Sequence, residues 1–168
     1  MIYVAKFEKV SFEQFKKDCE NINIETADLD KELRKCYDDI KLPKRNTKGS
    51  AGYDFYIPLI TTLTPNLPNI IPTGIRCKID EDWVLMLHPR SSLGFKYGVS
   101  LANTTGIIDS DYYYSDNEGH IMVKLNTEKT TFIDKGERFV QGIFLHYGVT
   151  VDDNATEKRN GGFGSTGK

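Results

Sequence analysis

The chain has 168 residues, of which 39% are hydrophobic and 27% charged, and this balance predicts one folded domain rather than a disordered chain. Its 22 basic and 24 acidic residues leave a formal net charge of −2, which disfavours a protein that coats nucleic acid. No apolar run approaches the ~18 residues of a membrane span, and the charged N-terminal stretch is not typical of a signal peptide.

Three cysteines, Cys19, Cys36 and Cys77, are widely spaced and form no CxxC pair. This pattern argues against a disulfide framework and against a structural zinc site. It favours a reducing compartment, so we expect a cytoplasmic protein. From the net charge and the absence of a long apolar run, we expect it to bind neither nucleic acid nor a membrane.

Helices are predicted only in the first forty residues. Residues 1–7 alternate weakly and suggest a strand. Ser11 and Gln14 have the spacing of a capping box, which predicts a short helix to about Glu20. A second helix is predicted from Thr26 to about Asp39, because its apolar residues recur on one helical face.

From Ala51 onward, short apolar runs alternate with clusters of Gly, Pro, Asn and Thr. Strands are predicted at residues 53–57, 70–79, 84–88, 121–126 and 139–149. Turns are predicted at residues 65–69, 80–82, 94–98 and 134–136. Short strands separated by turns indicate an all-β fold, either an antiparallel barrel or a sandwich.

The glycine-rich C-terminus matches the P-loop pattern from Gly162 to Lys168. A P-loop needs a helix and a Ser or Thr after the lysine, and neither follows here, so we do not expect one. Two readings remain open. The segment is a disordered tail, or it is a flexible arm in which Arg159 grips phosphate and Phe163 stacks on a base.

Two further groups could carry chemistry. Arg90, Ser91 and Ser92 follow a predicted strand and could direct several donors at one anion, or they could form an ordinary turn. Asp109 follows two apolar residues and could deprotonate a water, or it could be a solvated turn residue.

Residues 115–120 are predicted to form an exposed hairpin tip, with His120 as a surface or structural histidine rather than a metal ligand. Asp54 offers one carboxylate at the start of the first strong strand. Arg138 and Gln141 interrupt an apolar strand, which is more often structural than catalytic.

The order of these groups is more specific than any one of them. AGYDFY, PRSSLG, NTTGIIDSDY, GERFVQ and RNGGFGSTG occur in sequence between about Lys41 and Lys168. This series resembles the five motifs of the trimeric deoxyuridine triphosphatase (dUTPase) family. The resemblance implies a jelly-roll β-barrel that assembles as a homotrimer with shared active sites. It also implies hydrolysis of dUTP to dUMP and pyrophosphate with Mg2+.

The resemblance divides the chain into an N-terminal α-helical extension (1–40), a β-barrel (41–156) and a flexible C-terminal arm that closes the site (157–168). It implies that Asp109 activates the attacking water and that Asp54 holds waters of the magnesium shell. The residues that it implies bind substrate are Arg90, Ser91, Ser92, Asn103, Ile107, Ile108, Tyr112, Met122, Gln141, Arg159, Phe163, Gly164 and Ser165.

Among these, Ser91 would bond the oxygen that bridges the α- and β-phosphates, and Ser92 would offer a backbone N–H. Asn103 would line the uracil pocket, Tyr112 would exclude a 2′-hydroxyl, and Met122 would lie beneath the base. In the same way, Gln141 would reach the phosphates, Arg159 would hold the γ-phosphate and Phe163 would stack on uracil.

Two features depart from the family pattern. Residues 113–120 (YYSDNEGH) make a longer connection than many members have. The last motif is one residue shorter between its arginine and phenylalanine than in many members, so either Lys158 or Arg159 could meet the γ-phosphate. The planar fork of arginine favours Arg159.

Two other functions remain as alternatives. The first is a regulatory protein that uses the dUTPase fold to bind a protein partner through the N-terminal extension or through the longer connection at residues 113–120, which we call the insertion. The second is a dCTP deaminase, which the context of Asp109 disfavours.

Overall fold

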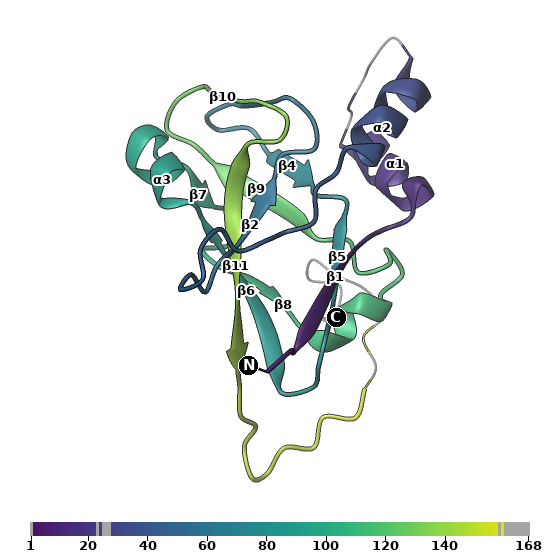
Figure 1. Ribbon diagram of the computed structural model, residues 1–168, viewed down its shortest axis with the longest axis vertical. Helices are drawn as coiled ribbons and strands as arrows, with labels where there is room; N and C mark the ends of the chain where they lie inside the picture. Colours follow the sequence, from purple (N-terminus) through teal and green to yellow (C-terminus); the bar gives the residue numbers. More distant parts are fainter. Residues whose placement is uncertain (1, 23, 25–27, 158, 160–168) are drawn as a thin grey trace.

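The structure is a computed structural model that describes residues 2–22, 24, 28–157 and 159. Figure 1 shows a β-rich body with a pair of helices on one side. The helical elements are α1 (Phe12–Asn21), α2 (Leu29–Asp38), α3 (Ser91–Tyr97) and the 3-10 helix η1 (Ser110–Tyr114). The strands are β1 (Ala5–Lys9), β2 (Tyr53–Tyr56), β3 (Thr61–Leu63), β4 (Asn69–Pro72), β5 (Ile75–Ile79), β6 (Trp83–Pro89), β7 (Ser100–Leu101), β8 (Gly106–Ile108), β9 (Met122–Asn126), β10 (Thr131–Ile133) and β11 (Arg138–His146).

The strands pair in four small antiparallel sheets. The largest has the order β2-β11-β6-β8, and a second has the order β4-β9-β7. The strands β1 and β5 form a third sheet, and β10 and β3 form a fourth. The predicted β-rich character is therefore confirmed, but these hydrogen bonds do not link the strands into one closed barrel.

The body encloses one apolar core. Its largest fully buried side chains include Phe55, Leu85, Leu125 and Phe139. In β9, buried and exposed side chains alternate strictly after the first residue, as expected for a strand with one face on the core.

Three predicted boundaries change. The strand predicted over residues 70–79 is divided between β4 and β5, because Gly74 takes a φ of +71° that interrupts the extended backbone. The turn predicted at residues 94–98 lies mostly within α3, whose left-handed C-cap is Gly98. The last strand ends at His146 rather than at residue 149.

The first forty residues attach to the body in two ways. β1 pairs with β5 over its whole length. The helices α1 and α2 lie side by side (Figure 1) and form a small core of their own from Val10, Phe15, Cys19 and Leu33. The extension is therefore packed against the body along both a strand and a helix pair.

The predicted capping box at Ser11 is half right. The Ser11 hydroxyl accepts the Gln14 N–H at 3.1 Å, as predicted. The Gln14 side chain does not return to the Ser11 N–H but donates to Asp18 at 2.8 Å. Glu118 takes its place, accepting the Ser11 N–H at 2.7 Å and the Ser11 hydroxyl at 2.6 Å. A carboxylate from elsewhere in the chain thus caps α1.

The prediction of an exposed hairpin tip at residues 115–120 is wrong. This segment follows η1 as a series of turns, and Ser115 and His120 are buried in it. The physical reason is the contact with the N-terminal extension, which supplies partners for Glu118 and His120. No helix in the described part of the chain is long and apolar enough to cross a membrane.

Glu8 joins β1 to the same region. It accepts a hydrogen bond from the Tyr113 hydroxyl at 2.7 Å and forms an ion pair with Arg76 of β5 at 3.3 Å. Hydrogen bonds from Lys6 and Tyr113 lower the pKa of Glu8 from 4.5 to about 2. Because the folded-state pKa is depressed, this stabilisation is complete above the unfolded-state pKa and is lost as the pH falls toward 2.

We therefore expect Glu8→Gln to lower the free energy of unfolding by about 1 kcal/mol at pH 7, an amount limited by the partial exposure of the carboxylate. The loss should be smaller at pH 3, where the wild-type carboxylate is partly protonated in the unfolded state. Urea unfolding at the two pH values measures the difference. Glu81→Gln, in the exposed turn between β5 and β6, is the matched control. An equal loss for Glu8→Gln at both pH values would contradict the prediction.

Candidate active site

A cavity lies beside β8, and we call it the β8 cavity. It has a volume of about 600 Å³. Among its lining residues are six that the sequence predicted to bind substrate: Asn103, Ile107, Ile108, Tyr112, Met122 and Arg159. The structure thus gathers side chains from β8, η1, β9 and the segment after β11.

Strand pairing positions this wall of the cavity. β8 pairs with β6, placing Gly106 opposite Leu87 and Ile108 opposite Leu85. A Cβ on Gly106 would lie 3.0 Å from the Leu87 Cβ, so a glycine allows the close approach. Ile107, one of the two apolar residues before Asp109, is 59% exposed and lines the cavity rather than the core.

Asp109 stands directly after β8 and is the N-cap of η1. Its carboxylate pairs with Arg159 at 3.0 Å, and the same guanidinium contacts Asp111 at 3.2 Å. Arg159 also lies over the Tyr112 ring, 5.5 Å from the centroid. Arg159 therefore meets the candidate base in this structure, and Arg90 lies in a different pocket.

A second, smaller hollow holds other predicted residues, and we call it the β2–β11 pocket. It has a volume of about 180 Å³. It is lined by Asn46, Ser50, Gly52, Asp54, Arg90, Ser91 and Gln141. The register explains the gathering, because Gln141 of β11 lies opposite Asp54 of β2 on one side and His88 of β6 on the other.

Asp54 is the electrostatic centre of this pocket. Its side chain pairs with Arg138 at 3.0 Å and with Arg90 at 3.6 Å, and Asn46 donates to it as well. The residue is 8% exposed, so these partners offset the cost of burying its charge. Sequence reasoning missed Asn46 and treated Arg138 as structural. The GER turn before β11 was the available signal for Arg138.

Gly52 shapes the same pocket. A Cβ at this position would lie 2.6 Å from the Gln141 Oε1, so only glycine leaves the amide in its present place. Ser92 lies next to the pocket in a separate hollow that it shares with Arg90 and Arg138. Arg90 is the N-cap of α3, and the first N–H groups of that helix have no intrahelical partner.

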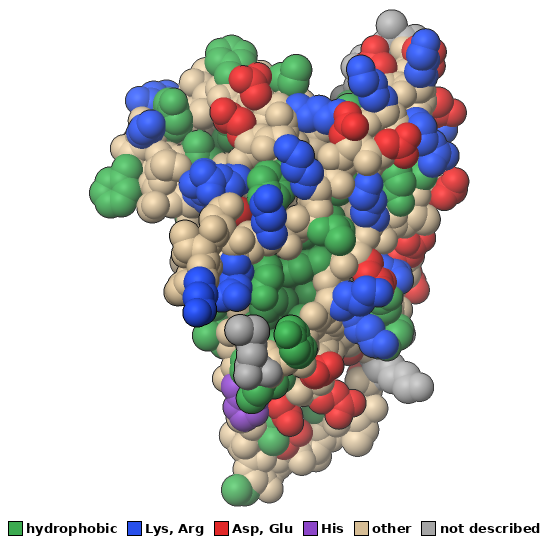
Figure 2. All heavy atoms as spheres, viewed as in Figure 1, with side chains coloured by type: hydrophobic (Ala, Val, Ile, Leu, Met, Phe, Trp, Pro, Cys, Tyr) green, Lys and Arg blue, Asp and Glu red, His purple; other side chains and the backbone are tan. Residues whose placement is uncertain are grey.

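The predicted site is thus divided within one chain, because the β8 cavity and the β2–β11 pocket share no lining residue. Lys158, Phe163, Gly164 and Ser165 lie outside the described residues. The near-neutral net charge conceals a local separation of charge. Figure 2 shows basic side chains beside and above an apolar area in the middle of one face, with acidic ones below it.

The comparisons with known proteins agree in family. The dUTPase family model matches residues 38–167. A deoxyuridine 5'-triphosphate nucleotidohydrolase from Lactococcus lactis is 43% identical over 133 residues, covering 76% of this chain and 89% of the relative. One from Shigella flexneri serotype 5b is 36% identical over 155 residues, covering 86% of this chain and 97% of the relative.

Solved structures show the same fold. The dUTPase from Streptococcus mutans is 38% identical with a TM-score of 0.61, and the match covers 67% of this chain and 89% of that one. A dUTPase from phage phi11 of S. aureus is 17% identical with a TM-score of 0.64, covering 92% of this chain and 98% of that one. The family model spans most of the chain and the L. lactis relative aligns over nearly its whole length, so the chain belongs to the dUTPase family.

Proposed function

We propose that this protein hydrolyses dUTP to dUMP and pyrophosphate. The observation that carries the proposal is the place of Asp109, a carboxylate that directly follows Ile108 and pairs with Arg159, both of which line a largely apolar cavity that contains the buried Tyr112. Such a cavity can accept a nucleobase and its sugar. The phosphate chain of the bound nucleotide would then extend out of the cavity toward Asp109.

The β8 cavity suits a pyrimidine nucleoside. Ile107, Ile108 and Met122 offer apolar surface to the base, and Asn103 offers an amide that can hydrogen-bond to its edge. Tyr112 packs under the deoxyribose, where its ring leaves no room for a 2′-hydroxyl. The arm, residues 157–168, closes over the site, with Phe163 stacked on uracil and Gly164 and Ser165 near the phosphates.

The reaction is a displacement at the α-phosphorus. Asp109 takes a proton from a water whose oxygen forms the new bond, and the bond to the α–β bridging oxygen breaks. The Ser91 hydroxyl donates to that bridging oxygen, and Ser92 and Gln141 hold phosphate oxygens. Arg90 and Arg159 neutralise phosphate charge, which requires Arg159 to leave Asp109 when the triphosphate arrives.

The donors of the β2–β11 pocket fit magnesium held mainly by the substrate. Carboxylate and water oxygens are the ligands that Mg2+ prefers, and it commonly uses only one or two protein carboxylates with substrate phosphates. Asp54 is the one carboxylate among the lining residues of this pocket, and it would act through water. The ion, when bound, supplies positive charge that offsets the triphosphate.

We further propose a jelly-roll barrel that assembles as a homotrimer with sites shared between subunits. Support comes from the separation of the two pockets. The groups proposed to hold the nucleoside line the β8 cavity, whereas Arg90, Ser91 and Gln141, which are proposed to hold phosphates, line the β2–β11 pocket. Contact between neighbouring subunits would bring one chain's β8 cavity to another chain's β2–β11 pocket.

A regulatory function through the N-terminal extension or the insertion is less favoured. Ser11 and Glu118 bind each other, as do Asp18 and His120. The two segments therefore cover each other's polar groups, which a docking surface would leave free.

Pyrophosphate release tests the proposed activity. Incubation with dUTP and Mg2+ should yield pyrophosphate and dUMP, while dATP, dCTP, dGTP and dTTP should give little. Release from dCTP accompanied by ammonia would instead indicate deamination followed by hydrolysis. No release from dUTP would refute the proposal.

The role of Asp109 is tested by Asp109→Asn. The amide keeps the shape of the side chain but cannot accept the proton, so kcat should fall by ~10²–10⁴. Binding of a non-hydrolysable dUTP analogue, measured by calorimetry, should remain. Asp111→Asn is the matched control because Asp111 also pairs with Arg159, and its kcat should stay within a few-fold of wild type. Near-normal turnover by Asp109→Asn would show that another group is the base.

The shared site is tested by mixing two inactive variants, Asp109→Asn and Arg90→Gln. After the chains are unfolded and refolded together, random assortment should leave about a quarter of the sites with both groups intact. Activity should therefore return in the mixture and stay absent in each variant refolded alone. Sedimentation of the same samples should report a trimer. A trimer without recovered activity would place both groups of a site in one chain, and a monomer would refute the assembly.

A further inference from the structure

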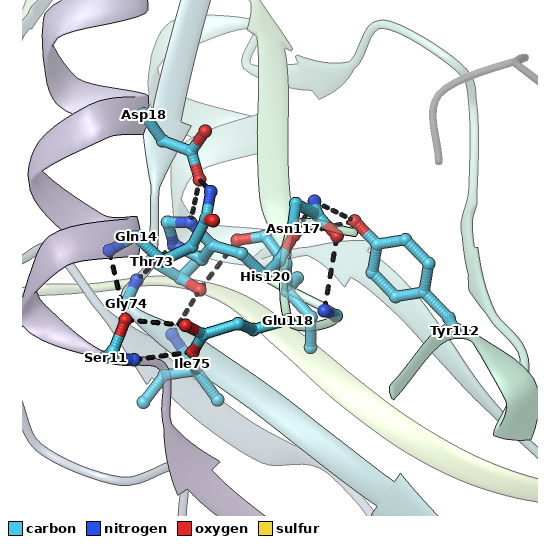
Figure 3. A network of polar contacts seen from close by, with 12 residues as sticks. Ser11, Gln14, Asp18, Thr73, Gly74, Ile75, Tyr112, Asn117, Glu118 and His120 are labelled. Carbon is cyan, nitrogen blue, oxygen red and sulfur yellow. Dashed lines mark hydrogen bonds and ion pairs between the residues drawn. The ribbon is translucent and has the colours of Figure 1, made fainter. Parts of the chain in front are cut away.

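The two segments outside the common family pattern contact each other at three points. Glu8 binds the Tyr113 hydroxyl, Ser11 binds both carboxylate oxygens of Glu118, and Asp18 binds His120 at 2.6 Å. These contacts join the N-terminal extension to residues 113–120 over more than a hundred positions of sequence. Figure 3 shows that α1 supplies one side of this network.

His120 connects α1 to the residues that line the β8 cavity. Its side chain is fully buried. Its Nδ1 donates to the Asp18 carboxylate, and its Nε2 accepts the Gly74 N–H at 2.8 Å. Only the neutral ring with its proton on Nδ1 satisfies both partners, which is how the tautomer is assigned. The ring is therefore held from both sides.

Two hydrogen bonds hold the Asp18 carboxylate in place. Burial alone would raise the pKa of Asp18, but hydrogen bonds from His120 and Gln14 outweigh that effect and lower it. The Gln14 amide and the His120 ring both donate to the same oxygen. Asp18 thus fixes the imidazole relative to α1.

The backbone of His120 then holds Tyr112. The Tyr112 hydroxyl donates to the His120 carbonyl at 2.8 Å and accepts from the Asn117 amide at 2.8 Å. Burial raises the pKa of Tyr112, so its hydroxyl remains a donor at neutral pH. The ring is 5% exposed and lines the β8 cavity, so these two bonds fix its orientation there.

The backbone of the segment that connects Tyr112 to His120 is tightly packed. A Cβ on Gly119 would lie 2.7 Å from the Tyr113 Cα and 2.8 Å from the Tyr112 carbonyl oxygen. The backbone of residue 119 therefore lies directly against that of residues 112 and 113. A shift of His120 cannot be absorbed between them and reaches Tyr112.

We propose that Asp18 and His120 are positioning residues that set the preference of the site for 2′-deoxyribose by holding Tyr112. The inference rests on the proposed function, which puts Tyr112 under the sugar. It assigns the N-terminal extension a role in specificity, although no residue of α1 lines the β8 cavity. Without the Asp18–His120 pair, the Tyr112 ring gains freedom and the site admits a 2′-hydroxyl more readily.

The test compares dUTP with UTP for Asp18→Ala. The ratio of the two kcat/KM values should fall about tenfold, the effect of one lost hydrogen bond of this kind. The change should appear mainly as a lower KM for UTP and less in kcat, because Asp109 directly follows β8 and forms its ion pair with Arg159 rather than with α1. Asp18→Asn keeps an acceptor for the His120 N–H and should restore most of the ratio. Glu20→Ala, on an exposed part of the same helix, is the matched control and should leave the ratio unchanged.

A double-mutant cycle with Tyr112→Phe separates positioning from general loss of stability. Both changes act through the tyrosine hydroxyl, so the double variant should lose no more selectivity than Tyr112→Phe alone. Additive losses, or a lower melting temperature with unchanged selectivity, would overturn the inference. If Asp18→Ala does not fold, Asn117→Ala removes the second partner of the hydroxyl, and unchanged selectivity in it would also overturn the inference.

Binding of dUMP and UMP by calorimetry gives a readout that does not depend on turnover, and the affinity ratio should fall in the same variants. A wild-type protein that does not hydrolyse dUTP would refute the proposed function. A wild-type protein that does so, with Asp18→Ala unchanged in both ratios, would refute only this inference.

Discussion

The double pairing of β11 is the constraint on which the arrangement of the candidate site depends. This strand is hydrogen-bonded to β2 along one edge and to β6 along the other. The first edge sets Gln141 against Asp54, and the second carries the register onward through β6 to β8 and so to Asp109. A register shift of one residue would turn every side chain of β11 to the opposite face. One sheet therefore positions Asp54 and Gln141 within it and Asp109 directly after its edge strand, although the two pockets beside it share no lining residue.

Around this sheet the chain buries several polar groups, and it buries them with partners. Asp54 has two guanidinium groups beside it, and the ring nitrogens of His120 each have one partner. Satisfied polar groups of this kind fix geometry more than they add stability, because removing one partner leaves the other buried and unpaired. In the first case the geometry fixes the two arginines beside the β2–β11 pocket, the proposed phosphate site. In the second it transmits the position of α1 to the wall of the β8 cavity.

Sequence reasoning predicted what depends on local pattern. The Ser11 cap, the apolar strands and each of the five motifs are visible within a few neighbouring residues. It failed where a distant residue decides the local structure. Glu118 replaces the Gln14 side chain in the cap, and burial of His120 depends on Asp18, which is remote in sequence. For the same reason the short strands β3, β7, β8 and β10 were missed, since each is only two or three residues long and is defined by its partner. The division of the predicted site residues between two pockets is also a property of the fold, which motif order cannot express.

The contact of Arg159 with Asp109 connects the arm to the chemistry. The Asp109 side chain is 46% exposed and that of Arg159 is 21% exposed, so water screens much of their attraction. Exposed pairs of this kind contribute only ~0–1 kcal/mol. A triphosphate offers the guanidinium more charge and a geometry that it can bind with two hydrogen bonds. The exchange from carboxylate to phosphate therefore costs little, and it has two effects at once. On the proposed mechanism, the exchange moves Arg159 toward the phosphates and frees the Asp109 oxygen that is proposed to accept the proton. The proposed base would then become available only when substrate is bound.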